Sequence, residues 1–304
     1  MAVEAPLPPR ELAERVGALY GDDLVEYEEV GRAIRAEILR ELPSDWTFEG
    51  KSVLDFGCGA GRTLRHLLDE AESGTFYGCD IDAASIAWLG SNLSPPLHVF
   101  ANGEEPPLAL ETGSLDLIWA ISVFTHISDH WAAWLVELHR LLRADGLLLA
   151  TIVGPALSDD WTEASPDPSV ARGQPPPGLT ERIGMNVVHH GRSWDQGGPA
   201  VFLSQWWIEE HWGRAFDLLT LREDGFAAIP PDWRGQGVVL ARKRPVEITV
   251  EELERIDPGD AREIEALRHN IRQLHHESQQ AQASAAWLEN ERAALAVRLS
   301  ESSA

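Results

Sequence analysis

The middle of the chain alternates short apolar runs with segments of helical periodicity. The run at residues 53–56 is apolar apart from Asp55 and stops at glycines, and further strand-like runs follow at residues 75–82 and 97–101. Buried parallel strands have this pattern where they turn into helices. Because the alternation continues to Val153, the sequence predicts an α/β domain built on a parallel sheet.

The segment before this core has a different pattern. Residues 10–42 show helical periodicity that is interrupted near Gly21 and ended by Pro43. We interpret residues 1–45 as an N-terminal helical cap that lies over the functional site.

The segment after Val153 changes character before regular structure resumes. Residues 154–205 interleave proline with Asp, Ser and Gly, which argues against long regular elements. Residues 205–215 then read as a helix, and residues 216–222 and 237–241 read as strands. We therefore expect one domain over residues 46–245, carrying a proline-rich insertion or lid at residues 154–205.

The C-terminal segment, residues 251–304, predicts a long helix from about Ala261 to Ser300. Apolar positions recur there at alternating steps of three and four residues, which is a heptad seam that one helix cannot bury alone. The seam positions are Ile264, Leu267, Ile271, Leu274, Ser278, Ala281, Ala285, Leu288, Arg292, Leu295 and Leu299. We expect a coiled coil, with itself or with a partner protein, whose strand number and orientation stay open. A solvated tail is the alternative, and Trp287 and Val297 lie off the seam.

Composition narrows the function classes. A formal net charge of −24 over 304 residues would repel a phosphate backbone, so we expect no nucleic-acid partner. No apolar run approaches the roughly 18 to 20 residues of a membrane span, and residues 1–10 lack the blocks of a signal peptide, so a cytoplasmic location is expected. The two cysteines, Cys58 and Cys79, predict neither a disulfide framework nor a metal site. We expect them to be reduced thiols.

The glycines after the first strand predict a ligand-binding loop. Gly57, Gly59 and Gly61 permit open backbone conformations and a close approach to a ligand, and Asp55 supplies a charge that suits a cation. Arg62 stands where the dinucleotide fingerprint has its last glycine, so a pyrophosphate-binding loop fits less well. A tight strand-to-helix turn without a ligand is the alternative.

The second strand ends in an acid about 20 residues after the loop. An acid at this distance commonly binds the two hydroxyls of a ribose, and Asp80 is the candidate. Asp82, two residues later, is the better candidate for the N-cap of the helix that follows.

These motifs, taken in order, resemble a known family. The run from residue 53 to residue 154 is similar to the core of class I S-adenosylmethionine-dependent methyltransferases, and it is closest to a bacterial subgroup with FGCGxGR and SVFTH signatures. The matching segments are VLDFGCGAGR at 53–62, TFYGCDID at 75–82, LDLIWA at 115–120, SVFTH at 122–126 and LHRLLRADGLLL at 138–149. The resemblance implies a Rossmann-like, doubly wound, mostly parallel sheet of seven strands, closed by an antiparallel pair.

The resemblance also implies roles for individual residues, with S-adenosylmethionine as the cofactor. In the glycine loop, Asp55 would face the ammonium of the methionine part, and the glycines would line that part. Asp80 would bind the ribose hydroxyls. The remaining implied contacts are Ile81 packed on the adenine, Asn102 accepting from the adenine amino group, and Ala120 offering backbone groups to the methionine part.

His126 is the candidate for the transfer step. It follows the fourth strand, at the edge of the sheet where doubly wound folds bind ligands, and its imidazole suits proton transfer near neutral pH. It would act as a base or only position the acceptor, and a purely structural role in the turn is the alternative. Asp129 and His130 read as the N-cap and a first-turn residue of a helix at residues 131–142.

The insertion carries further candidates for an acceptor site. His189 and His190 could reach over the site as part of a lid, or be solvated, and His211 reads as helix-face packing. Six of the twelve tryptophans could form a platform for a sugar or aromatic acceptor, or fill a core. These are Trp161, Trp194, Trp206, Trp207, Trp212 and Trp233.

The sequence thus predicts methyl transfer from S-adenosylmethionine to a small-molecule or glycan acceptor, most plausibly on oxygen, without a metal. The acceptor class follows from the tryptophan content and from an association of the subgroup with surface-polysaccharide genes that the resemblance suggests. Two alternatives stay open. One is a cofactor-binding scaffold that recruits a partner through its coiled coil with little turnover, and the other is a dinucleotide oxidoreductase.

Overall fold

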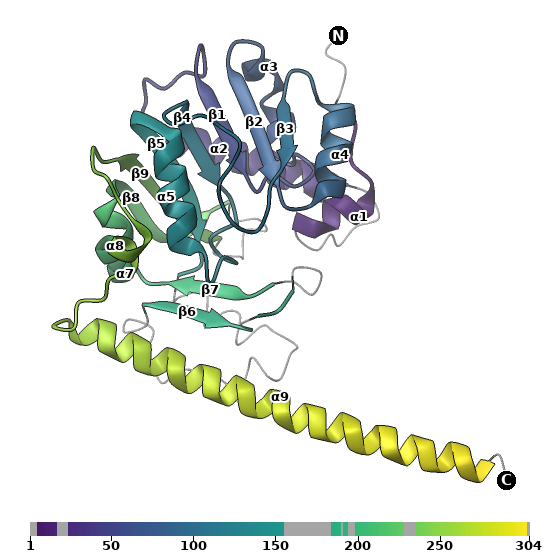
Figure 1. Ribbon diagram of the computed structural model, residues 1–304. Coiled ribbons are helices and arrows are strands. Elements are labelled where there is room, and N and C mark those ends of the chain that lie inside the picture. The colour runs from purple at the N-terminus through teal and green to yellow at the C-terminus, as the bar shows by residue number, and fades with distance from the viewer. Residues whose placement is uncertain are drawn as a thin grey trace.

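The computed structural model describes residues 5–16, 24–154, 184–189, 191–193, 198–227 and 235–302. A seven-stranded sheet with the order β3-β2-β1-β4-β5-β9-β8 forms the centre of the domain (Figure 1). Its strands are β1 (Ser52–Phe56), β2 (Thr75–Asp80), β3 (His98–Ala101), β4 (Leu115–Ala120), β5 (Leu142–Ile152), β8 (Phe216–Phe226) and β9 (Gln236–Lys243). This architecture confirms the predicted fold class.

The first five strands run parallel, and β9 runs antiparallel to both of its neighbours, β5 and β8. The carboxyl ends of β1 to β5 therefore meet at one edge, which is where such sheets bind ligands. The helices cover both faces. They are α1 (Arg10–Ala13), α2 (Val25–Glu41), α3 (Leu68–Ala71), α4 (Ala83–Asn92), α5 (Trp131–Leu141), α7 (Gln205–His211), α8 (Val250–Glu254) and α9 (Ala261–Ser302).

Each face of the sheet has its own apolar core, because both faces of a parallel sheet must be covered. Leu135 of α5 and Ile208 of α7 belong to the core on one face. Ile38 of α2 and Leu89 of α4 belong to the core on the other. The central strands are apolar on both sides for this reason, as their sequence predicted.

The ends of two helices follow from local chemistry. Asp82 caps α4, accepting a hydrogen bond from the Ala84 amide at 3.3 Å, as predicted. The predicted cap of α5 was wrong by one residue. His130 is at the N-cap position, with φ −107° and ψ 17°, so the helix begins at Trp131 and Asp129 lies before the cap.

The insertion contains a small antiparallel sheet of β6 (Met185–Val188) and β7 (Ala200–Leu203). The β7 strand joins the main domain, since the Leu203 amide donates to the Val153 carbonyl at 2.9 Å. Val201 and Leu203 are buried in the core. Removing residues 154–205 would therefore damage the domain itself. Residues 155–183 and His190, on which much of the lid prediction depends, lie outside the described residues.

The helix predicted near the C-terminus is α9, which has 42 residues. Its first turns pack on β6 and α7, and the rest continues past the domain (Figure 1). His211, predicted as helix-face packing, is buried and stacks on Trp207, and it also connects α7 to α8 and α9. Its Nδ1 lies 2.6 Å from the Leu253 carbonyl, and its Nε2 lies 3.0 Å from Glu263 of α9.

None of the helices in the described part of the chain combines the length and apolarity that a bilayer crossing needs.

Candidate functional site

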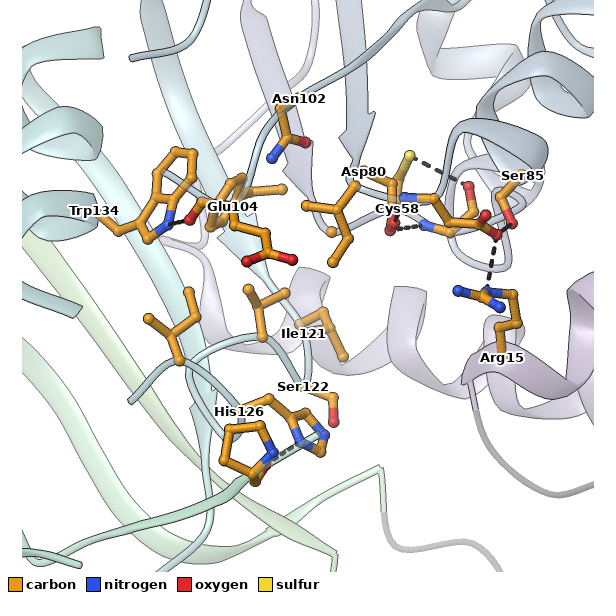
Figure 2. A pocket seen from close by; sticks show the side chains of 18 of the residues that line it. Arg15, Cys58, Asp80, Ser85, Asn102, Glu104, Ile121, Ser122, His126 and Trp134 are labelled. Atoms are coloured by element: carbon orange, nitrogen blue, oxygen red, sulfur yellow. Dashed lines mark hydrogen bonds and ion pairs between the residues drawn. The ribbon is translucent and has the colours of Figure 1, made fainter. Parts of the chain in front are cut away.

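A cavity of about 980 Å³ lies at the carboxyl edge of the parallel strands. It is lined by residues of the glycine loop, the ends of β2 and β3, the segment after β4, the N-terminal segment and the insertion (Figure 2). Seven of the nine predicted site residues line it: Asp55, Gly57, Gly59, Asp80, Ile81, Asn102 and His126. Gly61 and Ala120 do not. Ala120 is fully buried at the end of β4, and the Gly61 amide closes the loop by donating to the Cys58 carbonyl at 3.0 Å.

The glycine loop is held against the end of β2. The amides of Gly57 and Cys58 both donate to the Cys79 carbonyl, at 2.8 and 3.0 Å. Gly57 has φ +82°, and a Cβ there would lie 2.4 Å from Cγ2 of Val123. A side chain at Gly57 would thus push the loop away from the segment that follows β4.

Asp80 organises the loop through both carboxylate oxygens. Its Oδ2 accepts from the Gly59 amide at 2.7 Å, and its Oδ1 accepts from the Asp82 amide at 2.8 Å. Burial raises the pKa of Asp80, and these two hydrogen bonds oppose that rise. Because each carboxylate oxygen can accept more than one hydrogen bond, Asp80 keeps acceptor capacity toward the cavity.

Asp55 is the most buried carboxyl group of the site, with 3% of its surface exposed. Burial raises its pKa to about 7, the nearby charge of Asp80 adds to the rise, and Arg62 opposes it. Near pH 7, both the charged and the neutral form of the Asp55 carboxyl group are therefore populated. A cation bound beside it would favour the carboxylate.

Asn102 and Ile81 lie at the ends of β3 and β2. The side-chain amide of Asn102 donates to the Gly103 carbonyl at 2.7 Å, while its Oδ1 is buried without a hydrogen-bond partner in the structure. A buried acceptor without a donor is costly, so this atom suits a ligand donor. Ile81 is 36% exposed at the rim of the cavity, where it can pack on an apolar ligand surface.

His126 lies on another side of the cavity, next to Ser122 (Figure 2). Its Nδ1 lies 2.8 Å from the Pro199 carbonyl, which can only accept, so Nδ1 carries the proton and Nε2 is the acceptor of the neutral ring. Burial lowers the pKa of His126, and the bond to Pro199 opposes this. The ring is thus neutral at pH 7.

Ser122 anchors the turn that carries His126. It is one of four non-glycine residues with positive φ among those described, at 59°. Its amide donates to Thr151 Oγ1 at 2.7 Å, and its hydroxyl accepts from Gln236 Nε2 at 3.0 Å. A strained backbone held by two strands, here β5 and β9, is typical of functional turns.

Several lining residues were not predicted. Glu11, Glu14 and Arg15 come from the N-terminal segment, and Arg15 forms an ion pair with Asp82 at 3.0 Å. From the insertion, residues 191–193 and Pro199 line the cavity. No local pattern marks these residues, because their position depends on how distant segments pack.

Other predicted candidates lie elsewhere. The His189 amide donates to Glu277 of α9 at 3.2 Å, and His189 does not line the cavity. Trp206, Trp207 and Trp212 are buried, so they fill the core and form no platform at this cavity. Trp161, Trp194 and Trp233 lie outside the described residues. Both cysteines are buried free thiols.

A metal site needs several ligand side chains arranged around one ion. The described residues contain no group of three or more His, Cys, Asp or Glu side chains arranged to hold an ion.

Comparisons with known proteins agree with this geometry. Residues 54–148 match the family model for a methyltransferase domain. Over 107 residues the chain is 29% identical to phthiotriol/phenolphthiotriol dimycocerosates methyltransferase 1 of Mycobacterium ulcerans, a match that covers 35% of this chain and 39% of that protein. Over 148 residues it is 24% identical to a fatty-acid O-methyltransferase of Mycolicibacterium smegmatis, covering 48% and 53%. Over 111 residues it is 32% identical to a tRNA N(3)-methylcytidine methyltransferase of Schizosaccharomyces pombe, covering 33% and 35%.

The chain thus spans about a third to a half of the length of these curated relatives. A solved structure, a putative S-adenosylmethionine-dependent methyltransferase from Listeria monocytogenes, shares the fold with a TM-score of 0.51 and 18% identity, covering 70% of this chain and 99% of that one. The family match, the fold and the position of the cavity lead to one conclusion. Residues 54–148 form the core of a class I methyltransferase domain, and S-adenosylmethionine is its cofactor.

Proposed function

We propose that the whole chain transfers a methyl group from S-adenosylmethionine to a hydroxyl of a small molecule or glycan. One observation carries this proposal: a single cavity is lined by Asp55, Asp80 and Asn102 of the strand ends on one side and by the neutral His126 on another. A volume of about 980 Å³ is at the upper end of the range for ligand pockets, which suits a cofactor and an acceptor together.

The residues of the strand ends fit the cofactor, and we call them the cofactor side: Asp55, Gly57, Gly59, Asp80, Ile81 and Asn102. The unpartnered Oδ1 of Asn102 is an acceptor suited to the adenine amino group. Asp80 has acceptor capacity for the ribose hydroxyls, and Asp55 would bind the ammonium. When bound, the cofactor supplies an electrophilic methyl on a positively charged sulfur. The chain's part is then to position the two reactants and exclude water.

The acceptor side, as we call it, comprises Ser122, His126, Arg192 and Pro199. A neutral hydroxyl must lose its proton as it is methylated, and a neutral imidazole can take it. The Pro199 carbonyl fixes the ring by accepting from Nδ1, which leaves Nε2 as the atom that would take the proton. Because the pKa of His126 is lowered, the ring stays neutral near pH 7 and can accept a proton.

The charges around the cavity support a neutral acceptor. Seven carboxyl groups line it against three guanidinium groups. They belong to Glu11, Glu14, Asp55, Asp80, Asp82, Glu104 and Asp129, and to Arg15, Arg62 and Arg192. An anionic acceptor would be repelled on entry. The net charge of −24 disfavours RNA in the same way, although one relative is a tRNA methyltransferase. The fatty-acid O-methyltransferase relative agrees with oxygen as the acceptor atom, but a fatty acid ionises to the kind of anion that this cavity would repel.

Two experiments test the proposal. Titration calorimetry should show binding of S-adenosylmethionine and none of NAD, and binding of NAD alone would favour the oxidoreductase alternative. Incubation with methyl-labelled cofactor and panels of sugars, hydroxylated small molecules and tRNA should then label a neutral acceptor. Label in tRNA would overturn the acceptor class. Binding without transfer to any acceptor would favour the scaffold alternative.

A further inference from the structure

The two halves of α9 have different surroundings. The first half packs on the domain through Glu263, Ala266, Asn270 and Glu277. Asn270 donates to the Met185 carbonyl of β6 at 2.7 Å, and Glu277 accepts from the His189 amide. In the second half, residues 282–293 and Leu295 are all exposed, and Figure 1 shows this half continuing past the domain.

The heptad seam is not the face that docks on the domain. The docking residues recur at steps of three, four and seven, and the seam lies beside them on the helix surface. The seam therefore stays open. Ile271 is 65% exposed, Leu288 is 59% exposed, and Leu267, Leu274 and Leu295 are also exposed. An apolar seam of this length on a helix of 42 residues is typical of a coiled-coil surface.

A second feature lies beside the first half of the seam. A groove of about 310 Å³ opens between α5, β6, α7 and α9, and we call it the α9 groove. Its apolar lining comprises Trp131, Met185, Val187, Trp207, Ile256, Leu267 and Leu274. Trp131 and Trp207 meet edge to face with ring centres 4.7 Å apart. The groove is thus an aromatic surface next to two exposed seam leucines.

We propose that two copies of this chain pair through α9 in an antiparallel orientation, with the second half of each α9 lying over the α9 groove of the other copy. Ile271 then faces Leu288 of the second copy, and Ile264 faces its Leu295. By the two-fold symmetry, each contact occurs twice. The pair buries both halves of the seam, whose described Leu and Ile side chains are exposed in a single chain apart from the half-buried Ile264.

The charged positions favour this orientation over a parallel pair. In a parallel pair Arg292 of one copy would face Arg292 of the other within the seam. Two like charges would then be desolvated together. In the antiparallel register Arg292 faces Leu267, over which its long apolar stem can lie. Arg268 and Glu289, which flank the seam, then come together between copies as an opposite-charge pair.

Trp287 gives an independent argument. It is 62% exposed and lies off the seam, three heptads after Ala266, which is buried against the domain. Trp287 therefore lies on the same face of α9 as Ala266, which is the face by which the first half packs on the domain. In the antiparallel pair this position turns toward the domain of the second copy, at the level of the α9 groove. In a parallel pair Trp287 would stay in solvent, at the cost of an exposed indole.

Cysteine cross-linking in the full chain tests the orientation. The native Cys58 and Cys79 are buried, so they should not form disulfides between copies in this assay. The variants Ile271→Cys and Leu288→Cys should form disulfide-linked dimers only when they are combined. In the antiparallel pair two copies of residue 271 lie 17 residues apart along the axis, about 25 Å at 1.5 Å per residue. Cross-linking of each variant with itself would overturn the proposal in favour of a parallel pair.

Sedimentation of the full chain over a range of concentrations tests the pairing. We expect a dimer whose dissociation constant rises by about 10-fold in Trp287→Ala, since a tryptophan buried in an aromatic groove is a typical hot spot. Asn290→Ala, at an exposed position on the outer face of the helix, is the matched control and should leave the constant unchanged. A monomer at all concentrations would overturn the proposal. An unchanged dissociation constant in Trp287→Ala would contradict the contact between Trp287 and the α9 groove.

Discussion

The cofactor side and the acceptor side of the cavity are held in place by bonds of different range. On the cofactor side, Gly59 and Asp80 are joined by a hydrogen bond between residues 21 positions apart, within one strand-helix-strand unit. On the acceptor side, the bond between His126 and Pro199 spans 73 positions, and the bond between Ser122 and Gln236 spans 114.

This difference indicates how the two sides respond to change. The bonds between the glycine loop and the end of β2 require only that β1 and β2 pair, so most of the cofactor side depends on a small part of the domain. The acceptor side requires β5, β9 and the insertion to be in place. We therefore expect substitutions to separate cofactor affinity from transfer, except where the two sides touch at Gly57 and Val123.

Gly57→Ala should have the largest effect, because it disturbs the contact between the two sides. Its positive φ would strain any side chain by roughly 1 kcal/mol. The clash of the new Cβ with Val123 should add roughly 1 to 3 kcal/mol. We expect losses in both the free energy of unfolding and cofactor affinity, measured by denaturation and calorimetry.

Gly113→Ala is the matched control for Gly57→Ala. Gly113 has φ +65°, and a Cβ added there would have no neighbouring atom within 4 Å, so it shares the backbone strain without the clash. It should lose only the strain contribution and keep full cofactor affinity. Equal effects in the two variants would contradict the close contact between the loop and Val123.

His126→Ala should impair the acceptor side of the cavity and leave the cofactor side intact. As a general base His126 is worth about 10²-fold or more in kcat, roughly 2.7 kcal/mol, so transfer should fall by that factor with cofactor affinity unchanged. Because burial lowers its pKa, kcat of the wild type should rise with pH through a value below 6.5 and be level at pH 7. A loss of only a few-fold, with the pH profile intact, would assign His126 to positioning.

Asp80→Ala should weaken the cofactor side by about 2 kcal/mol in affinity, through lost charge-assisted hydrogen bonds. Because Asp80 also accepts from the Gly59 and Asp82 amides, stability must be measured together with calorimetric affinity. Asp82→Asn keeps an N-cap acceptor but loses the ion pair with Arg15, so it should weaken binding less than Asp80→Ala does. Full affinity in Asp80→Ala would remove Asp80 from the cofactor site.

The effect of Asp55 on stability should appear as a pH dependence. Its pKa is raised from 3.8 to about 7 in the folded chain, so the folded state binds more protons than the unfolded state between these values. The free energy of unfolding of the cofactor-free protein should thus fall as pH rises from about 4 through about 7. Asp55→Asn should flatten this contribution in denaturation curves at several pH values.

Cofactor binding should reverse the protonation of Asp55. If the ammonium lies beside the carboxyl group, it favours the charged form, and binding at pH 6 should release most of one proton. Calorimetry in buffers of different ionisation enthalpy measures this release. A wild type and an Asp55→Asn variant with equal release would place the ammonium elsewhere.

The prediction from sequence was most successful where structure depends on near neighbours. The strand that begins at Thr75, the Asp82 cap and the long helix from Ala261 were all predicted from local pattern. The glycines and acids of the cofactor side were candidates for the same reason, since the ends of adjacent parallel strands meet at one edge. Their roles toward the cofactor stay predictions.

Tertiary structure decided what depends on distant segments. Packing between α7, α8 and α9 gave His211, predicted only to pack on a helix face, its partners Leu253 and Glu263. The pattern of β7 lay within a proline-rich stretch, and its burial depends on a bond to Val153, 50 positions earlier. Residues that are distant in sequence come together only when the whole sheet has formed. Periodicity within a short window therefore identifies elements, and only their packing determines which side chains share a cavity.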